Sequence, residues 1–249
     1  MEQNMIYGRN SVLEGLRSKN ITINFVYIQK ESKKQMVGNI IKLAKDKHIP
    51  IKEVPRNKME QLLGNVNHQG IAAEVSPYEY VEIDDIIKYA NEKGEKPFIL
   101  VLDGIQDPHN LGSMIRSAEC SGVHGIVISK RHSVQVTPTV VKVSTGATAY
   151  VKIARVGNIN QTIKELKEKG FWIYGAEANG ETDFSDENYD TSVAMVIGAE
   201  GKGLSRLTSE LCDIRLNIPM KGKVNSLNAS VAAAILMFKV LEKRMMKKW

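Results

Sequence analysis

The fold class follows from one stretch of the chain, Phe98-Ile-Leu-Val-Leu-Asp-Gly-Ile-Gln-Asp-Pro-His-Asn-Leu-Gly-Ser-Met-Ile-Arg116. Its first five residues are apolar without polar alternation, which is typical of a parallel strand buried on both faces. A polar turn follows, and residues 111–121 then carry a helical pattern. The stretch therefore predicts a strand, a turn and a helix, the unit from which an α/β sheet is built.

Two later stretches repeat this order. They are residues 197–204, Ile-Gly-Ala-Glu-Gly-Lys-Gly-Leu, and residues 218–230, Ile-Pro-Met-Lys-Gly-Lys-Val-Asn-Ser-Leu-Asn-Ala-Ser. Similar strands are expected at 125–129, 171–175 and 193–198, and helices at 138–144, 160–169, 203–211 and 227–247. The pattern predicts a doubly wound parallel sheet. Because ligands of such sheets bind outside the carboxyl ends of the strands, the three turns predict one shared pocket.

The first 76 residues read as a separate small α/β domain. Helices are expected at 10–16, 35–46 and 58–63, and strands at 25–28, 51–54 and 70–75. Residues 77–95 read as an acidic linker that contains one helix, at 83–91. The second domain is expected to span residues 96–249.

Charge is unevenly distributed along the chain. Residues 1–76 hold 12 Lys and Arg against 7 Asp and Glu, residues 77–95 hold 2 against 6, and residues 96–249 hold 20 against 15. The net charge of +6 favours an anionic partner. Nucleic acid is the favoured class, although positive charges scattered over solvated faces would give the same total.

Several classes of protein are disfavoured by composition. No apolar run approaches the ~18 residues of a membrane span, and the first residues lack a signal-peptide pattern. The two cysteines, which we expect to be buried free thiols, are too few for a disulfide framework. The five histidines lack metal-ligand spacing, so no metal is expected. A cytoplasmic protein is the expectation.

The first and second stretches each offer a structural and a functional interpretation. Asn110 could be the N-cap of the helix that follows it. Arg116 could be a solvated charge, but apolar neighbours favour a partly buried helix whose guanidinium reaches a phosphate. The glycines at 198, 201 and 203 suggest close backbone approach to a flat ligand, and Glu200 is either a solvated carboxylate or a group facing that ligand.

The third stretch opens a long carboxy-terminal helix. Asn225 or Ser226 could cap this helix, whereas Asn228 is expected inside its first turn, where its amide could hold a substrate hydroxyl or a ligand carboxylate. An apolar stripe runs along the helix, and it is expected to pack either in the core or in a dimer interface. The stripe comprises Leu227, Val231, Ile235, Phe238, Leu241 and Met245.

Together the three stretches resemble the motifs of the SpoU (TrmH) family of RNA 2′-O-ribose methyltransferases. The resemblance covers the whole chain and is to the RlmB-like group, which methylates a guanosine ribose in 23S rRNA. It implies the SPOUT fold, an α/β sheet whose carboxy-terminal segment forms a trefoil knot. Residues 7–16 and 67–75 are similar to the RNA substrate-binding domain of that group, which resembles ribosomal protein L30e. A homodimer, S-adenosylmethionine as cofactor and 23S rRNA as substrate are likewise implied.

The resemblance also implies which residues form the site. The functional positions of the family are occupied by Asn110, Arg116, Glu200, Ser226 and Asn228. The cofactor would be bound by backbone and side chains of Gly198, Ala199, Gly201, Ile218, Met220, Ser226 and Leu227.

The chemistry implied is transfer of a methyl group from a sulfonium to a ribose 2′-oxygen. Arg116 is the base that the family suggests, yet an Arg with a pKa above ~12 stays protonated. We therefore hypothesise that Arg116 binds the adjacent phosphate and stabilises the developing alkoxide, while Glu200 or a water takes the proton.

Three alternatives stay open. The substrate could be tRNA, or the chain could be a non-catalytic RNA-binding factor in ribosome assembly. A nucleotide-dependent oxidoreductase is disfavoured because the early glycine fingerprint is missing.

Overall fold

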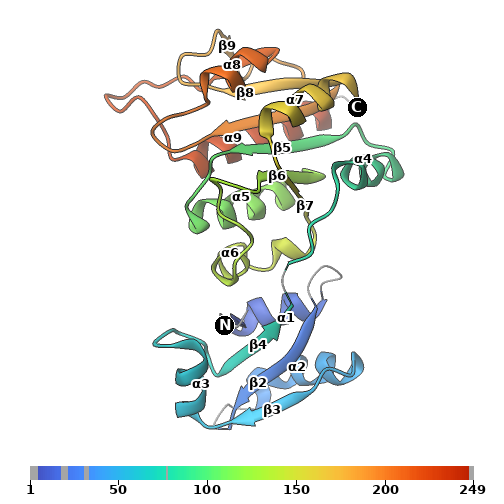
Figure 1. Cartoon of the computed structure of the whole chain (residues 1–249), viewed down its shortest axis with the longest axis vertical. Helices are drawn as coiled ribbons and strands as arrows, with labels where there is room; N and C mark the ends of the chain where they lie inside the picture. The colour runs from blue at the N-terminus through green and yellow to red at the C-terminus, as the bar shows by residue number, and fades with distance from the viewer. Residues whose placement is uncertain (1–4, 18–21, 31–33, 77, 247–249) are drawn as a thin grey trace. The chain divides into compact units, whose positions relative to one another are not determined.

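The computed structural model describes residues 5–17, 22–30, 34–76 and 78–246. Its contacts divide the chain into two compact units (Figure 1). Unit 1 comprises Met1–Glu79 and Val136–Tyr150, and unit 2 comprises Tyr80–Gln135 and Val151–Trp249.

Unit 1 is built on a four-stranded sheet in the order β1-β4-β2-β3. The strands are β1 (Met5–Tyr7), β2 (Ile23–Gln29), β3 (Ile51–Val54) and β4 (Ile71–Val75). Helices α1 (Arg9–Arg17) and α2 (Lys34–Asp46) share one apolar core with the sheet, and α3 (Arg56–Leu63) forms a second cluster through the buried Met59. The helices and strands expected in this region are present, and β1 is an addition that the sequence did not indicate.

A later part of the chain also belongs to unit 1. It contains α6 (Pro138–Val143) and the 3₁₀ helix η1 (Ala147–Ala149). Val141 is buried in the same core as Val12 and Leu16, and the Tyr150 hydroxyl donates to Glu14 over 2.7 Å. This differs from the expected second domain of residues 96–249, because apolar side chains of α6 find their partners in unit 1.

Unit 2 contains a seven-stranded sheet in which every pair of neighbours is parallel. The order is β7-β6-β5-β10-β8-β11-β9. The strands are β5 (Phe98–Asp103), β6 (Gly125–Ser129), β7 (Lys152–Val156), β8 (Phe171–Ala176), β9 (Thr182–Asp183), β10 (Ser192–Gly198) and β11 (Ile214–Asn217). The predicted α/β class with a parallel sheet is therefore confirmed.

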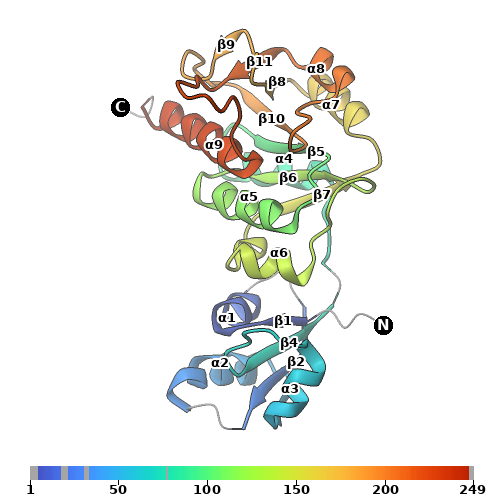
Figure 2. The same ribbon diagram turned by 90° about the vertical axis from the view of Figure 1, so that its left-hand side faces the viewer.

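Helices cover both faces of this sheet (Figure 2). On one face, α4 (Ile83–Glu92) and α7 (Ile159–Glu168) pack through Ile86, Ile163 and Leu166 against alternate strand residues. On the other face, α5 (Pro108–Cys120) lies beside α9 (Ala229–Met246). The short α8 (Arg206–Leu211) follows β10.

The expected linker of residues 77–95 is largely part of unit 2. Ile86 and Ala90 of α4 are fully buried, and Val81 forms a parallel bridge to Ala154 at the edge of the sheet. The acidic residues of α4 conceal this packing in the sequence, since they occupy the solvent side of an amphipathic helix.

The apolar stripe expected on the last helix is not the side that packs on the sheet. Ala233, Leu236, Met237 and Val240 form the buried side of α9, whereas Phe238 is 45% exposed. The prediction that this stripe packs in the core is therefore wrong. That it forms a dimer interface stays a prediction. The expected end of this helix at Lys247 lies outside the described residues.

The cysteines differ from expectation in one case. Cys212 is half-buried, and burial raises the pKa of its thiol to about 12. Cys120 is exposed rather than buried, since it lies at the end of α5 beside Glu119. Within the described residues, no helix has the length and apolar character needed to cross a membrane.

Candidate active site

The first two motifs lie at the same edge of the unit 2 sheet. Strands β5 and β10 are parallel neighbours, and their last residues, Asp103 and Gly198, are paired in register. The turns that follow both strands therefore leave the sheet side by side, at its carboxyl edge. This is the position at which open α/β sheets bind ligands.

Three of the predicted residues form one hydrogen-bonded cluster, which we call the Asn–Glu–Asn cluster: Asn110, Glu200 and Asn228. The side-chain amides of Asn110 and Asn228 both donate to Oε1 of Glu200, the latter over 2.9 Å. The Asn228 amide also donates to Oδ1 of Asn110 over 3.0 Å. One residue from each motif is thus present, so the three motifs meet at one point.

Asn110 does not cap its helix. The N-cap of α5 is Asp107, whose carboxylate accepts the His109 backbone N–H over 3.0 Å, and Pro108 takes the first helical position. Asn110 instead lies within the first turn and is only 6% exposed. A buried amide requires polar partners, and the cluster supplies them.

Asn228, in contrast, does cap its helix. Its Oδ1 accepts the backbone N–H groups of Ser230 and Val231, and its own carbonyl accepts from Ala232 at the start of α9. The expectation that Asn225 or Ser226 caps the helix is therefore wrong, because α9 begins only at Ala229. The Asn228 side chain caps with its oxygen and joins the cluster with its nitrogen.

The turn that carries Glu200 is tightly closed. The Gly203 N–H donates to the Ala199 carbonyl over 2.9 Å, and Gly201 and Gly203 have φ values of 71° and 66°. A Cβ at Gly198 would lie 2.1 Å from the Gly203 backbone. The close approach at Gly198 is therefore to the turn itself, whereas the glycine pattern in the sequence suggested close approach to a ligand.

Two predicted residues are not joined to the cluster. Arg116 is exposed on α5, and at about 100° per residue it points to a different side of the helix from Asn110. Ser226 is exposed in the segment that precedes α9. Neither makes a hydrogen bond to Asn110, Glu200 or Asn228 among the contacts of the described residues.

The residues predicted to bind a cofactor border these turns. Gly198 ends β10, and Ala199 and Gly201 belong to the tight turn. Ile218 directly follows β11, and Met220 and Leu227 lie in the segment between β11 and α9, where they are 39% and 38% exposed. His109, which adjoins the site in sequence, is exposed at the start of α5.

Sequence reasoning missed a second polar cluster close to this edge. Thr208 of α8 is buried, and its hydroxyl lies 2.7 Å from Oδ2 of Asp103 and 2.9 Å from Oδ1 of Asn160. Asp103 could have been noticed, since it is the polar residue that ends a buried strand. Thr208 and Asn160 gave no local signal.

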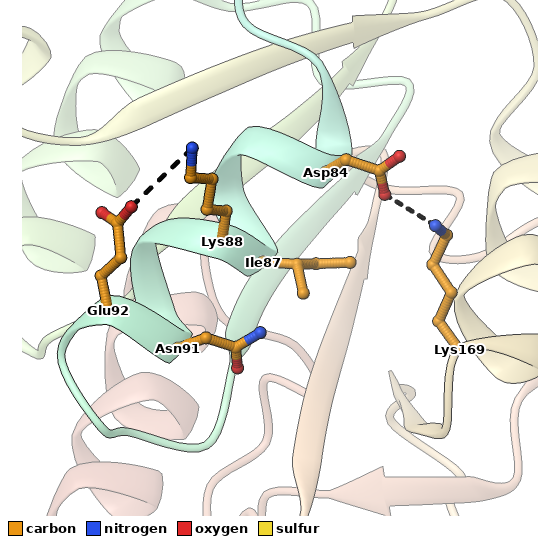
Figure 3. Close-up of a pocket in the computed structure, with 6 residues that line it drawn as sticks. All are labelled: Asp84, Ile87, Lys88, Asn91, Glu92 and Lys169. Carbon is orange, nitrogen blue, oxygen red and sulfur yellow. Dashed lines mark hydrogen bonds and ion pairs between the residues drawn. The ribbon is translucent and has the colours of Figure 1, made fainter.

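A separate hollow of about 530 Å³ lies against α4 (Figure 3). Ile87 and Asn91 line it between two ion pairs, Asp84–Lys169 at 2.6 Å and Lys88–Glu92 at 4.0 Å. Exposed ion pairs of this kind contribute little to stability. None of the lining residues belongs to the three motifs, so the Asn–Glu–Asn cluster is the better candidate site.

Comparison with family models gives two matches. Residues 97–238 match the SpoU rRNA Methylase family, and residues 5–81 match the model for RNA 2′-O ribose methyltransferase substrate binding. The two matches do not overlap.

Individual proteins are also similar to the chain. A relative from Staphylococcus aureus, whose name assigns it to the TrmH family of tRNA/rRNA methyltransferases, is 48% identical over 98% of each chain. An AdoMet-bound rRNA methyltransferase from Sinorhizobium meliloti has a TM-score of 0.80 at 22% identity, covering 96% of this chain and 86% of its own. A TrmH/SpoU tRNA modifying enzyme from A. aeolicus has a TM-score of 0.56 at 27% identity, covering 62% of this chain and 78% of its own.

The meeting of three motifs at one sheet edge thus coincides with a family match over the same residues and with close identity along nearly the whole chain. The protein belongs to the SpoU rRNA methylase family and is an RNA methyltransferase of that family.

Proposed function

We propose that this protein transfers a methyl group from S-adenosylmethionine to the 2′-oxygen of a guanosine ribose in 23S rRNA. The observation that carries the proposal is the Asn–Glu–Asn cluster, because it brings together polar residues of all three motifs. The substrate-binding model that matches residues 5–81 supports an RNA substrate.

The residues around the cluster fit S-adenosylmethionine. The exposed glycines of the two segments, Gly201, Gly203 and Gly222, present backbone without a side chain, and Met220 and Leu227 add exposed apolar side chains. Backbone polar groups beside apolar surface suit a ligand that combines an adenine ring with a charged amino acid part. When bound, the cofactor would supply a methyl group on a positively charged sulfur.

The protein's own residues would orient the ribose and remove its proton. Both amides of the cluster donate to Oε1 of Glu200, which fixes the carboxylate and leaves Oε2 to accept a proton from the ribose hydroxyl directly or through water. The exposed guanidinium of Arg116 would bind the neighbouring phosphate and stabilise the alkoxide. Ser226 would contact the ligands from the segment before α9.

Three exposed lysines near the cluster support an RNA substrate. Lys202 lies in the turn with Glu200, and Lys221 and Lys223 lie in the segment before Asn228. None of the three forms an ion pair with a described residue. Lysines of this kind are available for phosphate groups of RNA.

We also propose that the protein acts as a homodimer. The outward side of α9 carries exposed apolar residues at helical spacing, among them Val231, Phe238 and Met245. Monomeric proteins rarely expose a continuous apolar surface of this kind. A second copy of the chain would cover it, and α5, which carries Arg116, is in contact with α9.

The finer parts of the fold remain proposals of the same kind. Residues 1–76 would be an L30e-like domain that selects the RNA, and the segment from β11 to α9 would complete a trefoil knot. The α/β architecture of unit 1 and the match of residues 5–81 to the substrate-binding model support the proposed L30e-like domain. A cytoplasmic location follows from the proposed substrate.

Between rRNA and tRNA, the two-unit layout favours rRNA. The similar structure described as an rRNA methyltransferase aligns with 96% of this chain, whereas the tRNA modifying enzyme aligns with 62%. Similarity to the rRNA methyltransferase thus extends over nearly the whole chain, whereas similarity to the tRNA modifying enzyme does not. Methylation of tRNA stays the second candidate.

The test is methyl transfer from labelled S-adenosylmethionine to protein-free 23S rRNA, 16S rRNA and total tRNA. Label in 23S rRNA alone, lost in Arg116→Ala and Glu200→Gln, is the expected result. Label in tRNA alone would replace the substrate by the second candidate. Cofactor binding without transfer to any RNA or to an isolated large-subunit particle would favour a non-catalytic assembly factor.

A further inference from the structure

The polar cluster around Thr208 joins three elements of unit 2. Asp103 ends β5, Asn160 lies in the first turn of α7, and Thr208 belongs to α8. Ser205, the N-cap of α8, is the fourth member, with its hydroxyl 2.7 Å from that of Thr208. Thr208 is 1% exposed, so its hydroxyl depends on these partners.

The number of hydrogen bonds that each group can donate and accept determines how the cluster is arranged. A threonine hydroxyl has one proton to donate and can accept two hydrogen bonds. Asp103, as a carboxylate, can only accept, so the Thr208 proton goes to it. Thr208 must then accept from both Ser205 and Asn160, which requires the Asn160 amide to present its nitrogen. With the Asn160 amide turned so that its nitrogen faces Thr208, each of the four groups has a compatible partner.

This arrangement holds the turn that carries Glu200. At its start, Gly198 pairs with Asp103, and a Cβ on Gly104 would lie only 3.4 Å from that of Ala199. At its end, Ser205 is bound to Thr208, which is bound in turn to Asp103. The turn is therefore tied at both ends to one strand terminus.

We propose that Thr208 is a positioning residue for methyl transfer. Its hydroxyl fixes the turn at residues 199–205 so that Glu200 meets the amides of Asn110 and Asn228. Thr208 touches neither substrate nor cofactor in this scheme. The role in catalysis rests on the proposed function, whereas the fixing of the turn can be measured without it.

The test compares three variants. Thr208→Val removes the hydroxyl at nearly constant shape, and Thr208→Ser retains it. Thr162→Val is the matched control, because Thr162 is also buried but its hydroxyl donates to the carbonyl of Asn158, the N-cap of its own helix. Each variant is examined by hydrogen exchange of the backbone amides at residues 199–205 and by steady-state kinetics with the RNA that wild type methylates.

Thr208→Val is expected to raise exchange of these amides about tenfold, since a buried hydrogen bond is lost. It should lower kcat between about tenfold and a hundredfold with little change in KM for RNA, because misplacement of a reacting group affects the chemical step. Thr208→Ser should keep amide exchange and kcat at the wild-type values, and Thr162→Val should alter neither.

Unchanged exchange in Thr208→Val would overturn the proposal, as would equal losses of kcat in Thr208→Val and Thr162→Val. If wild type methylates no RNA, the proposed function fails while the exchange result still decides whether Thr208 fixes the turn. If exchange rises but kcat does not fall, the turn is fixed by Thr208 without effect on transfer, and the positioning role is rejected.

Discussion

Asn228 combines two tasks in one side chain, the capping of α9 and a place in the Asn–Glu–Asn cluster. Its oxygen accepts the first N–H groups of α9, and its nitrogen donates to Asn110 and Glu200. The start of the last helix is thereby fixed directly to the proposed site. A hydroxyl side chain can cap a helix but cannot supply two amide hydrogens.

The two tasks can be separated by substitution. Asn228→Ser is expected to lose most methyl transfer but to be more stable than Asn228→Ala, because the cap remains while the amide donors to Asn110 and Glu200 disappear. Asn228→Ala should lose the cap as well, at a cost of about 1 kcal/mol in the free energy of unfolding. Thermal unfolding and transfer assays measure the two effects, and full activity in Asn228→Ser would contradict the assignment.

His124 is buried at the opposite, amino edge of the sheet. Its Nδ1 accepts the Phe98 N–H over 3.0 Å, and its Nε2 lies 3.1 Å from Glu95. Burial lowers the pKa of this imidazole from its usual 6.5, although Glu95 opposes the effect. The folded protein therefore holds His124 neutral, with Nε2 as the donor.

This predicts how stability depends on pH. The unfolded chain binds the proton more readily than the fold, so the contribution of His124 is fully present above pH 6.5 and is lost as pH falls toward the lower folded pKa. The melting temperature of wild type should fall between pH 7.5 and 5.5, and the fall should be smaller in His124→Asn. An equal fall in both proteins would show that other groups govern this range.

At the scale of elements, the turn between β10 and α8 depends on Gly198. A Cβ there would lie within 2.4 Å of backbone atoms of Gly203 and Leu204. Backbone cannot move aside as a flexible side chain can, so the turn must open.

Gly198→Ala is accordingly expected to abolish methyl transfer and to lower the melting temperature. Gly157→Ala is the control, because a Cβ there meets no heavy atom within 4 Å. The control should retain activity and melt close to wild type. Loss of activity in Gly157→Ala alone would contradict the steric argument.

Most long elements of this chain were predictable, and the exceptions have physical causes. β7 is an edge strand that contains Lys152 and Arg155, so it lacks the apolar run that revealed β5. α8 begins at Arg206 rather than 203, because Ser205 caps it and Gly203 has a positive φ. On α9, the apolar stripe and the buried side differ, since small residues such as Ala229 and Ala233 allow close packing.

At the scale of the whole molecule, the exposed side of α9 predicts association. Phe238→Glu should convert the proposed dimer into a monomer, because an unpaired carboxylate would be buried in the interface. Leu207→Glu on α8 is the control, since Leu207 is similarly exposed, at 52%, but lies off this surface. Sedimentation of wild type as a monomer would reject the dimer.

The division into two units predicts where a core substitution acts. Val141 of α6 is buried in the core of unit 1, and Val127 of β6 in that of unit 2. Val141→Ala should increase hydrogen exchange in β1 and β4, and Val127→Ala in β5 and β10, each losing roughly 1–3 kcal/mol of local stability. If Val141→Ala loosened β5 and β10 instead, α6 would belong to unit 2.

The sequence by itself determined the α/β class, the positions of most helices and strands, and the three motifs that contain Asn110, Glu200 and Asn228. These follow from local apolar patterns and turn residues, which act over a few positions of the chain. Only the tertiary structure decided that these three side chains share hydrogen bonds, that Asn228 caps α9, that α6 packs in unit 1 and that Thr208 contacts Asp103. Those contacts join residues far apart in the chain, and their partners depend on strand order and helix packing, which no local pattern specifies.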